Sequence, residues 1–273
     1  MDLLLRDCVA LVTGSSRGIG LAIARALCEE GCRVALNARG RAGLAAAAAG
    51  LTGTSSAHVA DVTSADGARA LIADVVQRWG RIDVLVCNVG SGASVPPGQE
   101  TDAEWRRMLE LNLMAAMNAI AAARPHMAKT GAKTGAKTAA NTAAETGADA
   151  GGDRAILCIS SICGLAALGA PLTYAAAKAA LNAAVRGLAR PLAAEGVRIN
   201  AIAPGNILFE GGTWANKLAA APEAVADMLA REVALNRLGT PEEIAHLAAF
   251  LVSPRSSFIT GSIVIADGGQ LRG

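Results

Sequence analysis

Residues 9–20 of the chain read VALVTGSSRGIG. The apolar run at 9–12 predicts a buried strand, and the segment 18–30 has apolar side chains at helical spacing. The turn between them holds three glycines in the spacing G-x-x-x-G-x-G, namely Gly14, Gly18 and Gly20. Such a turn lets backbone amides approach a phosphate at the N-terminus of the helix, where the helix dipole favours an anion. It can equally be a tight connection, so this stretch by itself predicts only a strand–turn–helix unit.

Short apolar runs continue to alternate with longer segments of helical period along the chain. Further strands are expected at 33–36, 58–60, 82–87, 155–159, 197–202 and 262–265, and further helices at 41–49, 64–79, 102–127, 172–194 and 241–252. Thr101 is the expected N-cap of the helix at 102–127. The alternation predicts a parallel sheet with helices on both faces, the doubly wound α/β class. The length suits a single domain over residues 1–273.

Composition excludes several classes of protein. An apolar fraction of 52% and a charged fraction of 18% exclude an intrinsically disordered chain. The 25 basic and 23 acidic residues nearly balance, and aromatic residues make up only 3%, so nucleic acid is not an expected partner. No stretch reaches the ~20 uninterrupted apolar residues of a membrane helix, and the charged N-terminal residues do not resemble a signal peptide.

The six cysteines and three histidines do not predict a metal site or a disulfide framework. The cysteines form no C-x-x-C pair, and the histidines at 58, 126 and 246 are scattered. We therefore expect reduced thiols, no metal and a cytoplasmic location.

A low-complexity segment interrupts the α/β pattern. Residues 129–152 consist of six tetrapeptides, KTGA KTGA KTAA NTAA ETGA DAGG. The recurring GAKT is not a phosphate-binding P-loop, because Ala separates Gly from Lys and a helix, not a strand, precedes it. The composition predicts a mobile surface loop, on the side of the sheet opposite a site at the carboxyl ends of the strands.

Three polar residues form the strongest catalytic pattern. Tyr174 and Lys178 lie four residues apart on the helix expected at 172–194, so they share one face. Ser161 follows the preceding strand. A phenol is a poor acid–base catalyst at neutral pH, and a neighbouring ammonium is expected to lower its pKa toward the working range. An isolated Tyr–Lys pair on an Ala-rich helix would more often be a surface feature.

Together with other motifs, these residues resemble the short-chain dehydrogenase/reductase family. The matching motifs run in order along nearly the whole chain: TGSSRGIG at 13–20, Asp61-Val62, Asn88-Val89-Gly90, Asn112, Ser160-Ser161, YAAAK at 174–178, RINAIAPG at 198–205 and ITGSIVIADGG at 259–269. The resemblance implies a single Rossmann-type domain with a seven-stranded parallel sheet. Within the family, the overall pattern is most similar to the 3-oxoacyl-[acyl-carrier-protein] reductases.

The resemblance also implies roles for individual residues. Tyr174 would be the general acid/base, Lys178 would bind the nicotinamide ribose and lower the Tyr pKa, Ser161 would orient the carbonyl, and Asn112 would support a proton-relay water. The residues expected to contact the cofactor are Gly14, Ser16, Arg17, Gly18, Ile19, Gly20, Arg39, Asp61, Val62, Asn88, Gly90, Tyr174, Lys178, Pro204, Gly205 and Ile207.

Two departures from the family pattern leave this catalytic set intact. Val89 replaces the usual Ala beside the cofactor, and the 129–152 repeat replaces a short connection. The segment from 206 to about 231 corresponds to the family's substrate lid. The expected substrate-pocket residues are Cys163, Leu165, Phe209 and Trp214.

Residues at the end of the second strand predict the cofactor. The position of an NAD-selective carboxylate corresponds to Ala38, and Arg39 follows it. Arg17 in the glycine turn is the second guanidinium expected to bind the 2′-phosphate of NADP(H).

The sequence therefore predicts an NADP(H)-dependent enzyme that interconverts a carbonyl and a secondary alcohol, with a 3-oxoacyl thioester as the leading substrate. A dehydrogenase acting on a small diol, sugar or hydroxy compound is the alternative enzyme, and a catalytically idle cofactor-binding regulator is the alternative of another class. A homotetramer is the expected assembly, since the resemblance implies pairing of helices and the 172–194 helix is rich in Ala.

Overall fold

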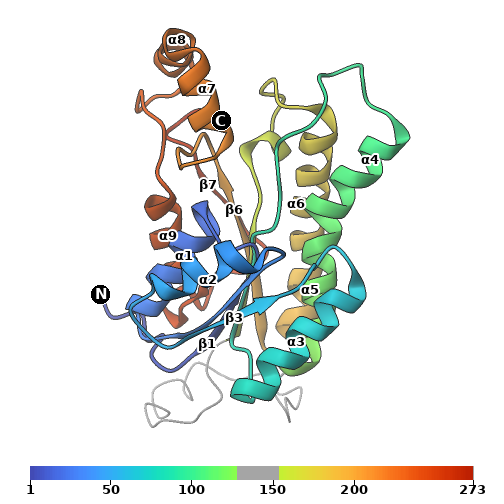
Figure 1. The fold of residues 1–273 in the computed structure, drawn as a ribbon, viewed down its shortest axis with the longest axis vertical. Helices are drawn as coiled ribbons and strands as arrows, with labels where there is room; N and C mark the ends of the chain where they lie inside the picture. Colours follow the sequence, from blue (N-terminus) through green and yellow to red (C-terminus); the bar gives the residue numbers. More distant parts are fainter. Residues whose placement is uncertain (128–153, 273) are drawn as a thin grey trace.

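A seven-stranded sheet, in which every strand is parallel to its neighbours, forms the centre of the molecule (Figure 1). The computed structural model describes residues 1–127 and 154–272. The strands are β1 (Val9–Val12), β2 (Arg33–Ala38), β3 (Ser55–Val59), β4 (Val84–Cys87), β5 (Arg154–Ile159), β6 (Val197–Pro204) and β7 (Ile263–Ala266). Their order across the sheet is β3-β2-β1-β4-β5-β6-β7. The predicted doubly wound α/β class and the Rossmann-type sheet are confirmed.

Helices cover both faces of this sheet. One face carries α1 (Gly18–Glu29), α2 (Arg41–Ala49) and α9 (Pro241–Val252), and the other carries α3 (Ala65–Trp79), α5 (Ala115–Met127) and α6 (Leu172–Ala194) (Figure 1). Alternate residues of β1 divide between the two resulting cores: Ala10 and Val12 face α1 and α9, whereas Val9 and Leu11 face α3 and α5. All four are fully buried, which explains why the strands lack polar alternation.

The remaining helical segments lie around the carboxyl ends of the strands or extend the helices already named. Helix α4 (Asp102–Leu109) continues through a π-helical turn at Glu110–Met114 into α5, and Thr101 caps α4 as predicted by accepting a hydrogen bond from Glu104 N. A 3₁₀ turn at Ile162–Gly164 follows β5, and another at Pro254–Ser256 follows α9. Helices α7 (Thr213–Ala220) and α8 (Pro222–Glu232) extend beyond the sheet, in orange in Figure 1.

The strand limits predicted from the sequence differ most from the observed ones at the edge of the sheet. Strand β3 occupies Ser55–Val59 rather than 58–60, and only His58 in it is buried. The two serines that open β3 carry no apolar signal, yet their backbones pair with Val34 and Ala35 of β2. Strand β6 runs two residues past its predicted end, to Pro204. The repeat at 129–152 lies outside the described residues.

The order of the strands creates the position for a site. Strand β1 lies between β2 and β4, so the connections that leave β1 and β4 diverge to opposite faces of the sheet. A crevice forms at the carboxyl ends of the strands at such a switch point. Within the described residues no helix has the length and apolar character needed to cross a lipid bilayer.

Candidate active site

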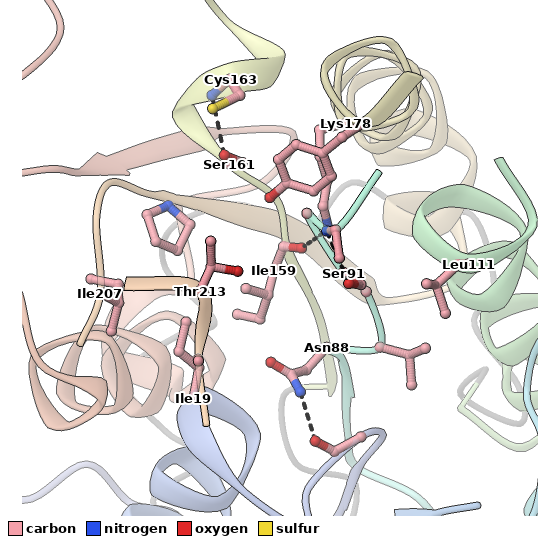
Figure 2. A pocket seen from close by; sticks show the side chains of 18 of the residues that line it. Ile19, Asn88, Ser91, Leu111, Ile159, Ser161, Cys163, Lys178, Ile207 and Thr213 are labelled. Atoms are coloured by element: carbon pink, nitrogen blue, oxygen red, sulfur yellow. Dashed lines mark hydrogen bonds between the residues drawn. The ribbon is translucent and has the colours of Figure 1, made fainter. Parts of the chain in front are cut away.

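A cleft of about 1060 Å³ opens at this end of the sheet (Figure 2). It is lined by the turns that follow β1, β2, β4, β5 and β6, and by residues of the lid segment, 206–231. Most of the predicted site residues line it: Gly14, Ser16, Arg17, Ile19, Arg39, Asp61, Val62, Asn88, Gly90, Ser161, Cys163, Tyr174, Lys178, Pro204, Gly205, Ile207, Phe209 and Trp214. Four predicted residues, Gly18, Gly20, Asn112 and Leu165, do not line it.

The glycine turn after β1 is fixed by a side chain from β4. Asn88 Nδ2 donates to the carbonyl oxygens of Thr13 at 3.1 Å and Gly14 at 3.0 Å. A Cβ on Gly20 would lie 2.4 Å from Asn88 Nδ2 and 2.5 Å from Gly14 O, so only glycine fits there. Gly20 therefore shapes the turn from behind, without reaching the cleft.

The N-terminus of α1 opens toward this turn. The side chain of the N-cap residue, Arg17, makes no hydrogen bond to the backbone N–H groups of the first turn. That turn also contains no acidic residue. Backbone N–H groups at a helix N-terminus are a suitable site for a phosphate.

The lid segment packs directly on the glycine turn. Arg17 Nη1 donates to the carbonyl oxygen of Gly211 at 3.0 Å. The ring of Phe209 lies where a Cβ on Gly18 would be, at 2.8 Å. Gly18 has φ +55°, so a side chain there would be strained as well as blocked. The role of Gly18 is thus to accommodate the lid. In this arrangement the Arg17 guanidinium is bonded to the lid.

The end of β2 offers one cation next to one carboxylate. Arg39 follows Ala38 and lies close enough to Asp61 to contribute to lowering the pKa of that carboxyl. The larger cause is the hydrogen bond from the Thr63 hydroxyl, at 2.7 Å from Asp61 Oδ1. Asp61 is thus ionised at neutral pH and orders the turn after β3.

The predicted catalytic residues come together at the ends of β5 and α6. The Tyr174 hydroxyl lies near enough to the Ser161 side chain for Ser161 to act to lower the pKa of the phenol. Lys178 Nζ lies 5.9 Å from the centroid of the Tyr174 ring and donates to the carbonyl oxygen of Ile159 at 2.8 Å (Figure 2). Lys178 is only 3% exposed. Ser161 also accepts from Cys163 N at 3.1 Å, which fixes the 3₁₀ turn after β5.

The electrostatics of this group differ from the sequence-based expectation. Burial raises the pKa of Tyr174 to about 12, with the nearby Ser161 side chain acting in the opposite direction. Burial also lowers the pKa of Lys178 to about 8. We expected Lys178 to lower the pKa of the phenol, and in this structure desolvation outweighs any such effect.

Asn112 lies behind the cleft in the π-helical turn. Its Oδ1 accepts from Ser91 N at 3.0 Å, and its Nδ2 donates to Ser91 O at 3.1 Å and Met108 O at 3.2 Å. A Cβ on Gly90 would lie 2.8 Å from Asn112 Oδ1 and 3.1 Å from Lys178 Nζ. Asn112 therefore ties the segment after β4 to α4 and sets the wall against which Lys178 packs. Both amide protons are occupied, and Oδ1 retains one acceptor position.

The predicted substrate residues divide into two groups. Cys163, Phe209 and Trp214 line the cleft, and Lys217 Nζ lies 4.5 Å from the centroid of a Trp214 ring. Leu165 is 36% exposed and does not line the cleft, although Leu168 and Pro171 of the same segment do. The expectation for Leu165 was wrong.

Sequence reasoning missed several residues of the cleft, among them Arg107, Lys217, Met228, Glu232 and Gln270. None belongs to a motif, and they come from α4, α7, α8 and the C-terminal segment. Their place in the cleft depends on tertiary packing that no local pattern encodes.

The arrangement fits a nicotinamide dinucleotide. The cleft extends from the glycine turn and α1 N-terminus, suited to a pyrophosphate, to Tyr174 and Lys178. Two of the three Lys178 protons have no partner among the described residues, so they can bind ribose hydroxyls. Within the described part of the chain, no group of three or more His, Cys, Asp or Glu side chains could hold a metal ion.

Comparison with known proteins gives the family. A family model for short chain dehydrogenases matches residues 8–214. The chain belongs to this family. Members bind a nicotinamide cofactor and act as oxidoreductases on alcohols and carbonyls.

Relatives within the family carry different substrates in their names. The chain is 34% identical to L-fucose dehydrogenase of Oryctolagus cuniculus, over 96% of this chain and 84% of the relative. It is 30% identical to the 3-oxoacyl-[acyl-carrier-protein] reductase FabG of Thermotoga maritima, over 96% of each.

Solved structures of the family include complexes with either cofactor. RhlG of Pseudomonas aeruginosa, solved with NADP, has a TM-score of 0.84 and 31% identity, over 98% of each chain. A 7α-hydroxysteroid dehydrogenase solved with NADH and 7-oxo glycochenodeoxycholic acid has a TM-score of 0.83 and 28% identity, over 100% of this chain and 97% of that one.

Proposed function

We propose that the protein is an NADP(H)-dependent oxidoreductase that interconverts a carbonyl and a secondary alcohol, with Tyr174 as the general acid and base. The observation that carries this proposal is the Tyr174 phenol, which lies at the wall of the cleft near Ser161 and one helical turn from the buried Lys178. The chemistry that a bound nicotinamide supplies is hydride transfer to or from the carbonyl carbon.

The side chains of this chain have separate tasks in the reaction. Ser161 donates a hydrogen bond to the substrate oxygen and holds it beside the Tyr174 hydroxyl. Tyr174 gives its proton to that oxygen in reduction and takes it back in oxidation. Lys178, fixed by Ile159, binds the nicotinamide ribose and provides the positive charge that stabilises a phenolate. Asn112 supports the relay of protons to solvent by positioning the segment after β4.

We propose NADP(H) as the preferred cofactor. Ala38 places no carboxylate at the end of β2, and Arg39 lines the cleft directly after it. Arg17 also lines the cleft and can turn from Gly211 to the 2′-phosphate when the lid opens. The RhlG complex with NADP supports this choice of cofactor. The choice does not follow from the family alone, because the hydroxysteroid dehydrogenase was solved with NADH.

A 3-oxoacyl thioester is the substrate that we propose first. Similarity to FabG over 96% of both chains supports it. Similarity to L-fucose dehydrogenase supports the alternative of a small hydroxylated compound. The test is steady-state oxidation of NADPH with acetoacetyl thioesters, simple ketones and ketoses. Absence of Tyr174-dependent turnover with every compound would argue for the catalytically idle regulator.

We further propose a single domain over 1–273, a homotetramer and a cytoplasmic location. Six alanines of α6 are exposed or half-buried, and their small side chains would allow a helix of another subunit to approach closely. They are Ala175, Ala176, Ala179, Ala180, Ala183 and Ala184. Cys28, Cys32, Cys87, Cys158 and Cys163 carry free thiols, as in a reducing compartment. Light scattering at micromolar concentration tests the assembly, and a monomer would contradict it.

A further inference from the structure

The C-terminal segment places one side chain with an unsatisfied acceptor at the wall of the cleft. Gln270 follows β7, lines the cleft and is only 9% exposed. Its Oε1 is shielded from solvent and has no hydrogen-bond partner among the described residues. Burying a carbonyl oxygen without a donor costs about 1–3 kcal/mol, so such groups are rare unless a ligand or water completes them.

A built turn holds Gln270 in this position. The Asp267 carboxylate accepts hydrogen bonds from the backbone on both sides of Gln270, from Gly269 N at 2.9 Å and Leu271 N at 2.7 Å. Leu235 N donates to Gly268 O at 3.0 Å, which attaches the turn to the chain after α8. The backbone position of Gln270 is therefore set by this turn, independently of any bond made by the amide itself.

The surroundings of Gln270 indicate the chemistry of its missing partner. Met228 and Glu232 of α8 line the same cleft, and Glu232 makes no ion pair within the described residues. The Gln270 carbonyl and the Glu232 carboxylate are both acceptors. Two acceptors among the residues that line this cleft favour a ligand that donates hydrogen bonds.

We propose that Gln270 is a specificity-determining residue: its side chain turns toward an entering substrate, so that Oε1, enclosed without a donor in this structure, accepts a hydrogen bond from a substrate O–H or N–H group away from the reacting carbonyl. This inference rests on the proposed function, because it assigns the substrate class of the same cleft. Two sources can supply the donor. One is a hydroxyl of a sugar-like or cyclic polyol, and the other is an amide N–H on the thiol side of an acyl thioester.

The experiment compares ketones in matched pairs with NADPH. One pair is 4-hydroxycyclohexanone and cyclohexanone, and the other is the acetoacetyl thioester of N-acetylcysteamine and its S-(2-acetoxyethyl) counterpart, in which an ester oxygen replaces the N–H. The two compounds of each pair differ in the hydrogen-bond donor. The ratio of their kcat/KM values therefore measures how strongly the enzyme recognises that donor. The ratio is measured for the wild type, Gln270→Leu, Gln270→Glu and Gln77→Leu. Gln77 is exposed on α3, so Gln77→Leu is the same chemical change away from the cleft.

We expect a preference for the donor of at least about ten-fold in one pair for the wild type, because a site built to bond a substrate group rejects the analogue that lacks it. Gln270→Leu should abolish this preference, mainly through KM, whereas Gln270→Glu, which keeps an acceptor, and Gln77→Leu should retain it. The pair that shows the preference identifies the source. No preference in either pair, or a preference that persists in Gln270→Leu, would overturn the proposal.

Calorimetric binding of the same compounds to the protein–NADP⁺ complex separates this inference from the proposed function. Donor-dependent binding that is lost in Gln270→Leu, without turnover of any ketone, would support the role of Gln270 and contradict the proposed function. Neither binding nor turnover would contradict both.

Discussion

Lys178 donates a hydrogen bond from Nζ to the carbonyl oxygen of Ile159, at 2.8 Å. Ile159 is the last residue of β5 and lies two positions before Ser161, so one strand end fixes both the ammonium on α6 and the serine near the Tyr174 hydroxyl. The geometry of the candidate site is thus transmitted from the sheet. Burial of this lysine has a cost, seen in its pKa of about 8.

Tyr174→Phe tests the acid/base assignment. The change removes only the hydroxyl of a half-buried side chain, so NADP(H) binding should persist while kcat falls by at least ~10²-fold. Lys178→Ala should weaken both cofactor binding and turnover. Fluorescence titration and steady-state rates measure the two quantities. A Tyr174→Phe enzyme with a tenth or more of the wild-type rate would refute the assignment.

The lowered pKa of Lys178 predicts a pH dependence of stability. The unfolded chain holds this proton up to the ordinary pKa of 10.5, whereas the folded protein loses it near pH 8. Between these values the unfolded state binds more protons, so the contribution of Lys178 to the free energy of unfolding rises with pH. Below pH 8 the buried charge imposes its full penalty.

Lys178→Met isolates this contribution, since it keeps the length of the side chain without the charge. From pH 8 to 10.5, wild type should gain stability relative to Lys178→Met, by on the order of 3 kcal/mol in total. Denaturant unfolding at fixed pH values measures the difference. A difference that is constant over this range would show that Lys178 is not desolvated in the folded protein.

The parts of the fold that follow from local sequence were predicted, and those that depend on distant contacts were not. Buried strands such as Val9–Val12 and helices with a clear apolar face such as α9 have strong periodic signals. The spacing of Tyr174 and Lys178 likewise fixes their common face, whatever the rest of the chain does.

Other features have no local signal. The π-helical turn at Glu110–Met114 was expected as ordinary α-helix, because the bonds between Asn112 and Ser91 that accompany it join separate segments. The contact of Arg17 with Gly211 joins residues that are 194 positions apart in the sequence. Gln270 is an ordinary polar residue near the end of the sequence, and only the packing of the cleft makes it buried.

Two glycine-to-alanine changes of equal chemistry should have opposite effects. In Gly20→Ala the new methyl would overlap Asn88 Nδ2 and Gly14 O, so we expect a loss of about 1–3 kcal/mol of stability and weaker cofactor binding. In Gly43→Ala the nearest atom, Ser16 Cβ, is at 3.9 Å on an exposed helix, so we expect a gain of about 0.5–1 kcal/mol. Thermal unfolding compares them. Equal stability of Gly20→Ala and wild type would show that the turn is loosely packed.

Cofactor choice gives the sharpest test of the residues after β2. Arg39 forms no salt bridge among the described residues. Asp61 lies near enough for the charge of Arg39 to contribute to lowering the pKa of its carboxyl group. A 2′-phosphate beside it would gain charge-assisted hydrogen bonds of about 1.5–3 kcal/mol, so Arg39→Ala should lower kcat/KM for NADPH by about ten- to a hundred-fold with little change for NADH.

The exposed Arg41 of α2 does not line the cleft, so Arg41→Ala is the matched control and should leave both cofactors unaffected. Arg17→Ala should differ from both, because it also removes the bond to Gly211 that holds the lid. Arg17→Ala should therefore lower kcat/KM for NADH as well as for NADPH.

Ala38→Asp combined with Arg39→Ala introduces a carboxylate that accepts bonds from the ribose hydroxyls and repels a phosphate. This double variant should prefer NADH. The measurement is kcat/KM for both cofactors with one ketone. Equal values for the two cofactors in the wild type, or a preference for NADH, would contradict the proposed NADP(H) dependence.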